Sequence, residues 1–186
     1  PLRVVVTLPV LKDWVQQIGG SYVHVNSLMT GYESEHTYSP KPSDLVAVRK
    51  AALLFEVGAG LEVWVASLVK NAGNGSLRVV TTSKDIELIQ DHPEPAGTSH
   101  SHEHAAGNPH VWLDPAAAAT MVQHISDAMA AADPAHATDY RTNTATYLQA
   151  LTRVQDESLA RLRSLPSRAI IVHHPAWPYF ARRYDL

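Results

Sequence analysis

Hydrophobic residues in the first 81 positions fall into two alternating patterns. Short runs rich in β-branched and aliphatic side chains predict strands over Leu2–Thr7, Tyr22–Leu28, Leu53–Val57 and Leu77–Thr81. Between these runs, apolar residues recur every three or four positions, which predicts helices over Val10–Ile18, Pro42–Ala51 and Leu61–Lys70. Strands and helices that alternate in this order favour a mainly parallel sheet with right-handed crossovers. The predicted fold class is therefore α/β.

The sequence after Asp114 is strongly helical. It predicts one helix over Pro115–Ala131 and a second over His136–Ser164, which has neither proline nor glycine in 29 residues. At 1.5 Å per residue, the second helix would be about 40 Å long. Because the mean helix has only about 11–12 residues, a single helix of this length is the most unusual feature of the predicted architecture.

Two further elements follow the long helix. Ala169–Val172 predicts another strand and Ala176–Tyr184 another helix. One strand and one helix cannot bury their own apolar faces, so we expect the sequence to stop within a second α/β domain. At the other end, the chain opens on Pro1 without an initiator Met or a targeting segment, and we expect any such segment to precede it.

Composition narrows the classes of protein to which the chain can belong. Hydrophobic residues make up 45% of the 186 residues and charged residues 18%, which is typical of a globular protein and not of a disordered one. A formal net charge of −3 gives no basic surface of the kind that binds nucleic acid. No apolar run approaches the roughly 18 residues of a membrane helix. The sequence has no cysteine, which excludes disulfides, thiolate catalysis and cysteine-ligated metal sites.

Histidine is the residue type that points to chemistry. The chain has 11 histidines, five of them between His92 and His110, and a His-rich tract is a compositional sign of metal binding. His36, His110 and His174 each stand at a junction that leads into a predicted helix. α/β sheets place their ligands in loops at the carboxyl ends of parallel strands, and such junctions belong to those loops. His24, His124 and His136 match no such junction. We interpret them as surface or packing residues.

Three imidazoles would leave one position of a tetrahedral zinc site for a carboxylate or water. Glu35, next to His36, is a further candidate ligand. Of the adjacent His173 and His174, only one can face the metal from a strand. Taken singly, His36 is better explained as a solvated loop residue and His110 as a core or helix-capping residue. No His-Glu-x-x-His, Gly-x-Ser-x-Gly or phosphate-binding Gly-Lys-Ser/Thr segment is present.

These histidines lie in motifs that are typical of one family. The motifs are Leu8-Pro9, Glu35-His36-Thr37-Tyr38 with Pro42-Ser43-Asp44, Asn108-Pro109-His110-Val111-Trp112-Leu113-Asp114-Pro115, Tyr140 with Asn143, and His174 with Tyr179-Phe180-Ala181 and Tyr184. Over its whole length the chain resembles the metal-binding periplasmic solute-binding proteins, the zinc and manganese receptors of bacterial ABC importers, and among them the zinc receptors. Pro175 and Pro178 depart from the family pattern, which usually has an acidic or small residue and a glycine there.

The resemblance implies two α/β lobes joined by one long helix, with metal in the cleft between them. Residues 1–134 would form the N-terminal lobe, 135–165 the connecting helix and 166–186 the start of an incomplete C-terminal lobe. His36 and His110 would be ligands from the first lobe and His174 a ligand from the second. The family's fourth ligand, an Asp or Glu, would lie beyond Leu186. If the incomplete lobe holds His174 poorly, we expect zinc to lie on His36 and His110, with water or Glu35 filling in.

The loop Asp91–His104 resembles the His-rich insertion of the zinc receptors. Its residues His100, His102 and His104 could capture zinc loosely and pass it inward, and the alternative is a solvated loop without useful affinity. Three imidazoles favour Zn²⁺ over Mn²⁺, which prefers carboxylates.

The expected function is that of an extracytoplasmic, high-affinity Zn²⁺ receptor, with Mn²⁺ as the alternative, that delivers metal to the permease of an ABC importer. No catalysis is expected, because no general base stands beside an open metal position. The alternatives are a zinc-dependent hydrolase with Glu35 as its base, and a surface adhesin or metal chaperone. We expect the full-length protein to be a monomer that binds no nucleic acid, whereas the apolar side chains of Ala169–Leu186 would let this fragment self-associate.

Overall fold

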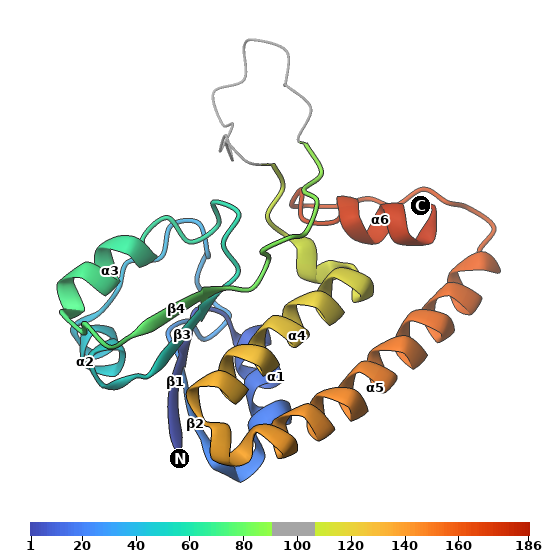
Figure 1. The fold of residues 1–186 in the computed structure, drawn as a ribbon. Coiled ribbons are helices and arrows are strands. Elements are labelled where there is room, and N and C mark those ends of the chain that lie inside the picture. Colours follow the sequence, from blue (N-terminus) through green and yellow to red (C-terminus); the bar gives the residue numbers. More distant parts are fainter. Residues whose placement is uncertain (91–106) are drawn as a thin grey trace, which may run out of the picture.

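Four short strands form one parallel sheet in the structure, a computed structural model that describes residues 1–90 and 107–186 (Figure 1). The strands are β1 (Leu2–Val6), β2 (Val23–Ser27), β3 (Leu53–Glu56) and β4 (Arg78–Thr81). They pair in the order β2-β1-β3-β4, with Val4 of β1 opposite both Val25 and Leu53. This sheet confirms the predicted α/β class, and its parallel strands bring their carboxyl ends to one edge.

Helices cover both faces of the sheet because each strand points its side chains alternately to either face. α1 (Pro9–Gly19) and α4 (Pro115–Ala132) pack on one face, and α2 (Pro42–Lys50) and α3 (Val65–Ala72) on the other. Val4 and Val6 belong to the core beneath α1 and α4, whereas Val5 belongs to the core beneath α2 and α3. Complete burial of such a side chain contributes about 1.5–3 kcal/mol.

The long helix α5 (Ala137–Arg163) is a single helix of 27 residues, close to the predicted range. Its first half packs against α1 and α4: Asn143 Nδ2 donates to the Ile18 carbonyl at 2.9 Å, and the Thr144 and Ser126 hydroxyls lie 2.8 Å apart. Its second half extends away from the sheet (Figure 1). Within the described ranges, no helix is both long and apolar enough to cross a membrane.

Prolines mark where several of these helices begin, and short 3₁₀ turns precede two helices, α4 and α5, and the strand β2. The turns are η1 (Gly20–Tyr22), η2 (Val111–Leu113) and η3 (Pro134–His136). Proline is the first residue of α1, α2, α4 and of the last helix, α6 (Pro178–Tyr184). A helix tolerates proline there because the missing N–H has no intrahelical partner in the first turn. α3 begins four residues later than predicted, because Leu61 and its neighbours form turns in which the Leu61 N–H donates to the Gly58 carbonyl.

The segment between α5 and α6 corrects one prediction. The sequence predicts a strand over Ala169–Val172, but these residues are exposed chain that pairs with none of the described strands. A strand is stabilised by hydrogen bonds to a neighbouring strand, and the four strands of the sheet lie elsewhere. The prediction of a strand at this position is wrong for this structure. The helix that follows, α6, begins two residues later than predicted and lies beside η2 and the start of α4 (Figure 1).

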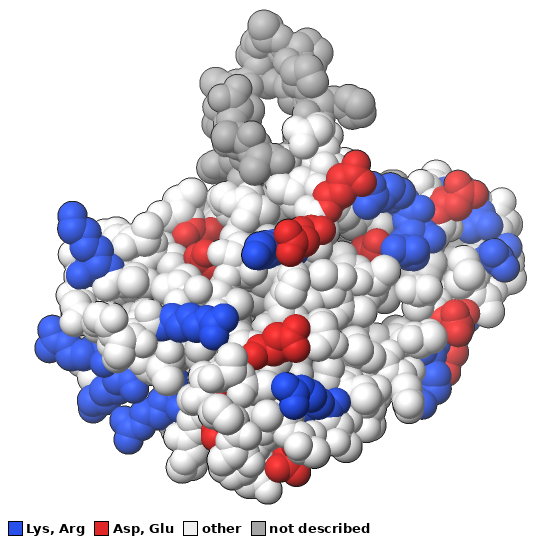
Figure 2. Space-filling view, in the orientation of Figure 1, with Lys and Arg blue, Asp and Glu red and all other residues white. Residues whose placement is uncertain are grey.

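Charged side chains of both signs lie on the face of the molecule that Figure 2 shows. Figure 2 shows basic and acidic groups interspersed on the face in view, with basic groups more frequent over α2 and α3. Lys50 of α2 and Lys70 of α3 are exposed there. This mixture agrees with the small formal net charge of −3.

Candidate metal centre

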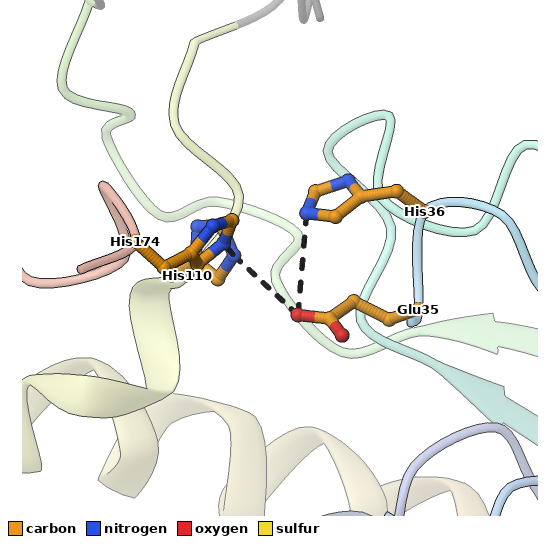
Figure 3. A group of neighbouring side chains, drawn as sticks. All are labelled: Glu35, His36, His110 and His174. Carbon is orange, nitrogen blue, oxygen red and sulfur yellow. Dashed lines mark hydrogen bonds and ion pairs between the residues drawn. The ribbon is translucent and has the colours of Figure 1, made fainter. Parts of the chain in front are cut away.

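Four side chains from three separate segments converge at the edge where the strands end (Figure 3). They are Glu35, His36, His110 and His174, and one potential ligand atom from each lies within 4.8 Å of the others. Within residues 1–90 and 107–186, this is the only group of three or more His, Asp or Glu side chains that could hold a metal ion.

The ligand atoms lie close to the spacing that a tetrahedral zinc ion requires, and two of the pairs nearly match it. The Nε2 atoms of His174 and His110 lie 3.1 Å apart, and Glu35 Oε1 lies 3.6 Å from His110 Nε2 and 4.0 Å from His36 Nε2. Zinc–nitrogen bonds of about 2.0–2.1 Å place the ligands of a tetrahedron about 3.3 Å from one another. Two of these three distances lie within a few tenths of an ångström of that value, and the four atoms together would have to draw closer from spacings of up to 4.8 Å.

The loop between β2 and α2 positions Glu35 and His36. The Thr37 N–H donates to the Ser34 carbonyl and closes a turn around the two residues. From another loop, the Trp64 indole N–H donates to the Glu35 carbonyl at 3.0 Å. The Tyr38 hydroxyl lies 2.9 Å from the Leu28 carbonyl and 2.8 Å from Asp44 Oδ2, so the far end of the loop is tied to the start of α2.

His110 lies at the start of η2 and is only 3% exposed. Its backbone N–H and its Nδ1 both contact Asn108 Oδ1, at 3.1 and 2.9 Å. The opposite ring nitrogen, Nε2, faces Glu35 and His174 (Figure 3). Trp112, whose ring centroid lies 5.3 Å from that of His110, shields the imidazole on one side.

His174 approaches from the segment before α6, although its side of the site is more exposed than that of His110. The carbonyl of Pro175 accepts a hydrogen bond from Asn108 Nδ2 at 2.8 Å, and the His174 carbonyl accepts one from the Ala176 N–H at 2.8 Å. The neighbouring His173 is exposed and lies outside the group.

The site carries a negative charge before any metal binds. A hydrogen bond with His110 lowers the pKa of Glu35 to about 2, with further help from the nearby His36 and against the effect of burial. The carboxylate is therefore ionised at every physiological pH. An ionised carboxylate and three imidazoles form a donor set that suits Zn²⁺, and one negative charge offsets part of the charge of the ion.

Other predicted residues lie apart from this site. His100, His102 and His104 of the predicted capture loop are outside the described residues. His124 Nδ1 lies 2.9 Å from the Thr82 carbonyl, and His136 Nδ1 lies 2.8 Å from Asp133 Oδ2. Both of these histidines therefore take part in packing contacts away from the four converging side chains.

One supporting residue, Glu62, was not found by sequence reasoning. Glu62 is 5% exposed, and its carboxylate accepts hydrogen bonds from the Thr7 hydroxyl and from the Val57 and Gly58 N–H groups at 2.7–2.9 Å. It thereby ties together the ends of β1 and β3, beneath the turn that carries Trp64. Burial raises the pKa of Glu62 to about 7, although these hydrogen bonds oppose the shift.

The comparisons with known proteins find metal-binding relatives. The family model described as ZnuA, zinc-uptake complex component A, periplasmic, matches residues 4–186. A protein of Treponema pallidum (strain Nichols), whose name describes it as metal-binding, is 32% identical over 190 residues, which are 100% of this chain and 60% of the relative. The manganese-binding lipoprotein MntA of Halalkalibacterium halodurans is 29% identical over 185 residues, which are 98% of this chain and 58% of the relative.

A solved structure of the same family is also similar to this chain. A crystal structure of ZnuA matches with a TM-score of 0.88 and 31% identity, and the match covers 100% of this chain and 68% of that one. The chain thus spans about three fifths of the length of the two curated relatives. Since the family model matches all but the first three residues, the chain belongs to the ZnuA family of periplasmic zinc-uptake components.

Proposed function

We propose that this chain is the metal-binding part of an extracytoplasmic receptor that captures Zn²⁺ and delivers it to the permease of an ABC importer. The observation that carries the proposal is the convergence of Glu35, His36, His110 and His174 on one point. The family to which the chain belongs consists of solute-binding proteins, and its description names zinc uptake and the periplasm. In this reading, zinc is the cargo of the protein.

The donor set supports zinc over manganese as that cargo. Three imidazole nitrogens and one carboxylate oxygen suit a borderline ion that accepts four ligands, whereas Mn²⁺ prefers more oxygen donors and six-fold coordination. The relative MntA is named for manganese, so the family includes both metals and the ligands of each member decide between them. We therefore assign Zn²⁺ as the preferred metal and Mn²⁺ as a weaker competitor.

Glu35 completes the site in this proposal. Its Oε1 lies as close to His110 Nε2 as a fellow ligand would, so the carboxylate occupies the fourth position. A hydrolase would need that position for water and a separate carboxylate to activate the water. The arrangement thus supports binding without catalysis.

The architecture in the proposal follows the family. Residues 1–134 would form one lobe, α5 within 135–165 the connecting helix, and 166–186 the start of a second lobe that supplies His174. The contacts of His110 with His174, 64 residues later in the sequence, support a site at the junction of the two parts.

Titration calorimetry with chelator-stripped protein tests the proposal. We expect one Zn²⁺ per chain and an affinity for Mn²⁺ at least about tenfold lower, in line with the ligand preferences of the two ions. The zinc-loaded protein should hydrolyse neither ester nor phosphoester substrates. Absence of zinc binding, or tighter binding of Mn²⁺ than of Zn²⁺, would contradict the proposal, and zinc-dependent turnover would favour the hydrolase.

A further inference from the structure

Asn108 is a buried amide that contacts both sides of the metal centre. It is 3% exposed. Its Oδ1 accepts a hydrogen bond from the His110 N–H at 3.1 Å and lies 2.9 Å from His110 Nδ1, and its Nδ2 donates to the Pro175 carbonyl at 2.8 Å. One side chain thus contacts the ligand His110 and the peptide that follows the ligand His174.

These partners determine the orientation of the amide and the tautomer of His110. The His110 backbone N–H can only donate and the Pro175 carbonyl can only accept, so Oδ1 must face the histidine and Nδ2 the carbonyl. An amide oxygen is solely an acceptor, and His110 Nδ1 must therefore carry the hydrogen. In the neutral ring Nε2 then keeps its lone pair, whereas in the protonated ring it also carries a hydrogen that Glu35 can accept. This atom is the one that faces Glu35 and His174.

The backbone of Asn108 is held as firmly as its side chain. Its N–H donates to the Ile89 carbonyl at 2.8 Å, and its carbonyl accepts the Tyr179 hydroxyl at 2.6 Å. The same hydroxyl accepts the Ile89 N–H at 2.9 Å, which closes a ring of hydrogen bonds around the fully buried Tyr179. Because such bonds are costly to break away from water, Asn108 has little freedom to turn away from His110.

We propose that Asn108 is a positioning residue that holds His110 in the Nδ1–H tautomer and, through Pro175, holds His174 against it. The proposal rests on the proposed function, because it assumes that Nε2 of each histidine binds the ion. A free neutral imidazole exchanges its hydrogen between the two nitrogens, and a neutral His110 with that hydrogen on Nε2 would have no lone pair there for the metal. Asn108 removes that competing state before zinc arrives and joins the site to the segment that leads into α6.

Variants of Asn108 separate its two contacts. Asn108→Ala removes both. Asn108→Asp keeps an oxygen acceptor beside His110 and replaces the donor to Pro175 by an oxygen, which the carbonyl repels. Asn143→Ala is the matched control. Asn143 lies on α5, and its side-chain amide likewise donates to a backbone carbonyl, that of Ile18.

The first readout is the tautomer of His110 in the metal-free protein, from the ¹⁵N shifts of the ring nitrogens in a long-range ¹H–¹⁵N spectrum. We expect the hydrogen on Nδ1 in the wild type, in Asn108→Asp and in Asn143→Ala, and a mixture with Nε2–H in Asn108→Ala. Hydrogen exchange of the Ala176 N–H, which donates to the His174 carbonyl, should be faster in both Asn108 variants than in the control.

The second readout is zinc affinity. Loss of a partner that orients a metal-binding histidine typically costs about 10–100-fold, and we expect a loss in this range for Asn108→Ala and none for Asn143→Ala. A His110 Nδ1 without a hydrogen in the metal-free wild type would overturn the inference even if Asn108→Ala fails to fold. Unchanged zinc affinity in a folded Asn108→Ala would also overturn it. If the wild type itself bound no zinc, the proposed function would fail, whatever the tautomer.

Discussion

Arg183 of α6 and Asp114, the residue that caps α4, form a two-point ion pair although 69 residues separate them in the sequence. Arg183 Nε lies 2.7 Å from Asp114 Oδ1, and Nη2 lies 2.8 Å from Oδ2. Asp114 Oδ1 also accepts the Ala116 N–H at 3.0 Å, which caps the first turn of α4. The pair therefore fastens the segment that carries His174 to the helix that follows His110.

Replacing Arg183 by Gln should weaken zinc binding although Arg183 touches no ligand. The substitution removes the planar fork that matches a carboxylate and leaves the buried Asp114 without its guanidinium. We expect zinc to dissociate about fivefold faster, equivalent to about 1 kcal/mol, the upper end for a partly exposed ion pair. Stopped-flow transfer of zinc to a chelator measures the rate. Arg153→Gln, at an exposed arginine of α5, is the control, and equal rates in all three proteins would contradict the role given to the pair.

Removing the His-rich loop should matter much less than removing a ligand. We expect His36→Ala, His110→Ala or His174→Ala each to lower zinc affinity by more than about 100-fold, the upper end for residues that merely orient a ligand. Deletion of residues 93–105 should leave the affinity within a few-fold of the wild type, because those residues contribute capture and the four converging side chains contribute affinity. Titration calorimetry on the four variants provides the comparison. Equal losses would place the main site in the loop.

The buried Glu62 predicts a dependence of stability on pH. Its pKa is raised from 4.5 to about 7 in the folded state, so between these values the folded protein holds a proton that the unfolded chain has released. The contribution of Glu62 to stability is therefore largest below pH 4.5, falls as the pH rises to about 7 and is constant above that. Glu62→Gln cannot titrate and should lack this decline.

Urea unfolding of metal-free protein at pH 5, 6, 7 and 8 tests the prediction for Glu62. The difference in unfolding free energy between Glu62→Gln and the wild type should move in favour of the variant as the pH rises from 5 to 7. Glu87→Gln, at an exposed glutamate, should follow the wild type at every pH. Parallel curves for the wild type and Glu62→Gln would show that Glu62 is ionised throughout this range.

The exposed apolar segment before α6 should make this chain self-associate. Ile170, Ile171 and Val172 are exposed, and the backbone there pairs with none of the described strands. An exposed apolar segment of extended chain invites pairing with another copy. We expect sedimentation velocity to show association that increases with concentration and is reduced by Ile171→Lys. The exposed Val46 of α2 supplies the control Val46→Lys, which should associate like the wild type. A monomer at all concentrations would contradict this prediction.

The local pattern of apolar and polar residues was sufficient to predict the strands of the sheet and most of the helices that cover it. Val4, Val5 and Val6 form a β-branched run whose alternate members face opposite cores, and this run alone predicts a buried strand. Prolines at the first position of four helices carry equally local information. Pro178 marks the true start of α6, because proline favours the first position of a helix. The apolar residues before Pro178 led instead to a predicted start at Ala176.

Non-local contacts account for what the sequence could not predict. Ala169–Val172 has the composition of a strand, yet pairing needs a neighbour that hydropathy does not reveal. The same limit applies to Asp114 and Arg183, and to the donors that surround Glu62, because their partners are brought close only by the fold. Asn108 left a weak signal, an amide two residues before a histidine, which is a spacing at which Asn often bonds to the backbone.

The most direct test of the proposed metal centre is the position of zinc in a crystal of the zinc-loaded chain. Diffraction data on either side of the zinc absorption edge locate the ion without assumptions about its ligands. We predict one anomalous peak about 2.0–2.2 Å from the Nε2 atoms of His36, His110 and His174 and from a carboxylate oxygen of Glu35. A peak bound instead by His100, His102 or His104, with the four converging side chains out of reach, would contradict it.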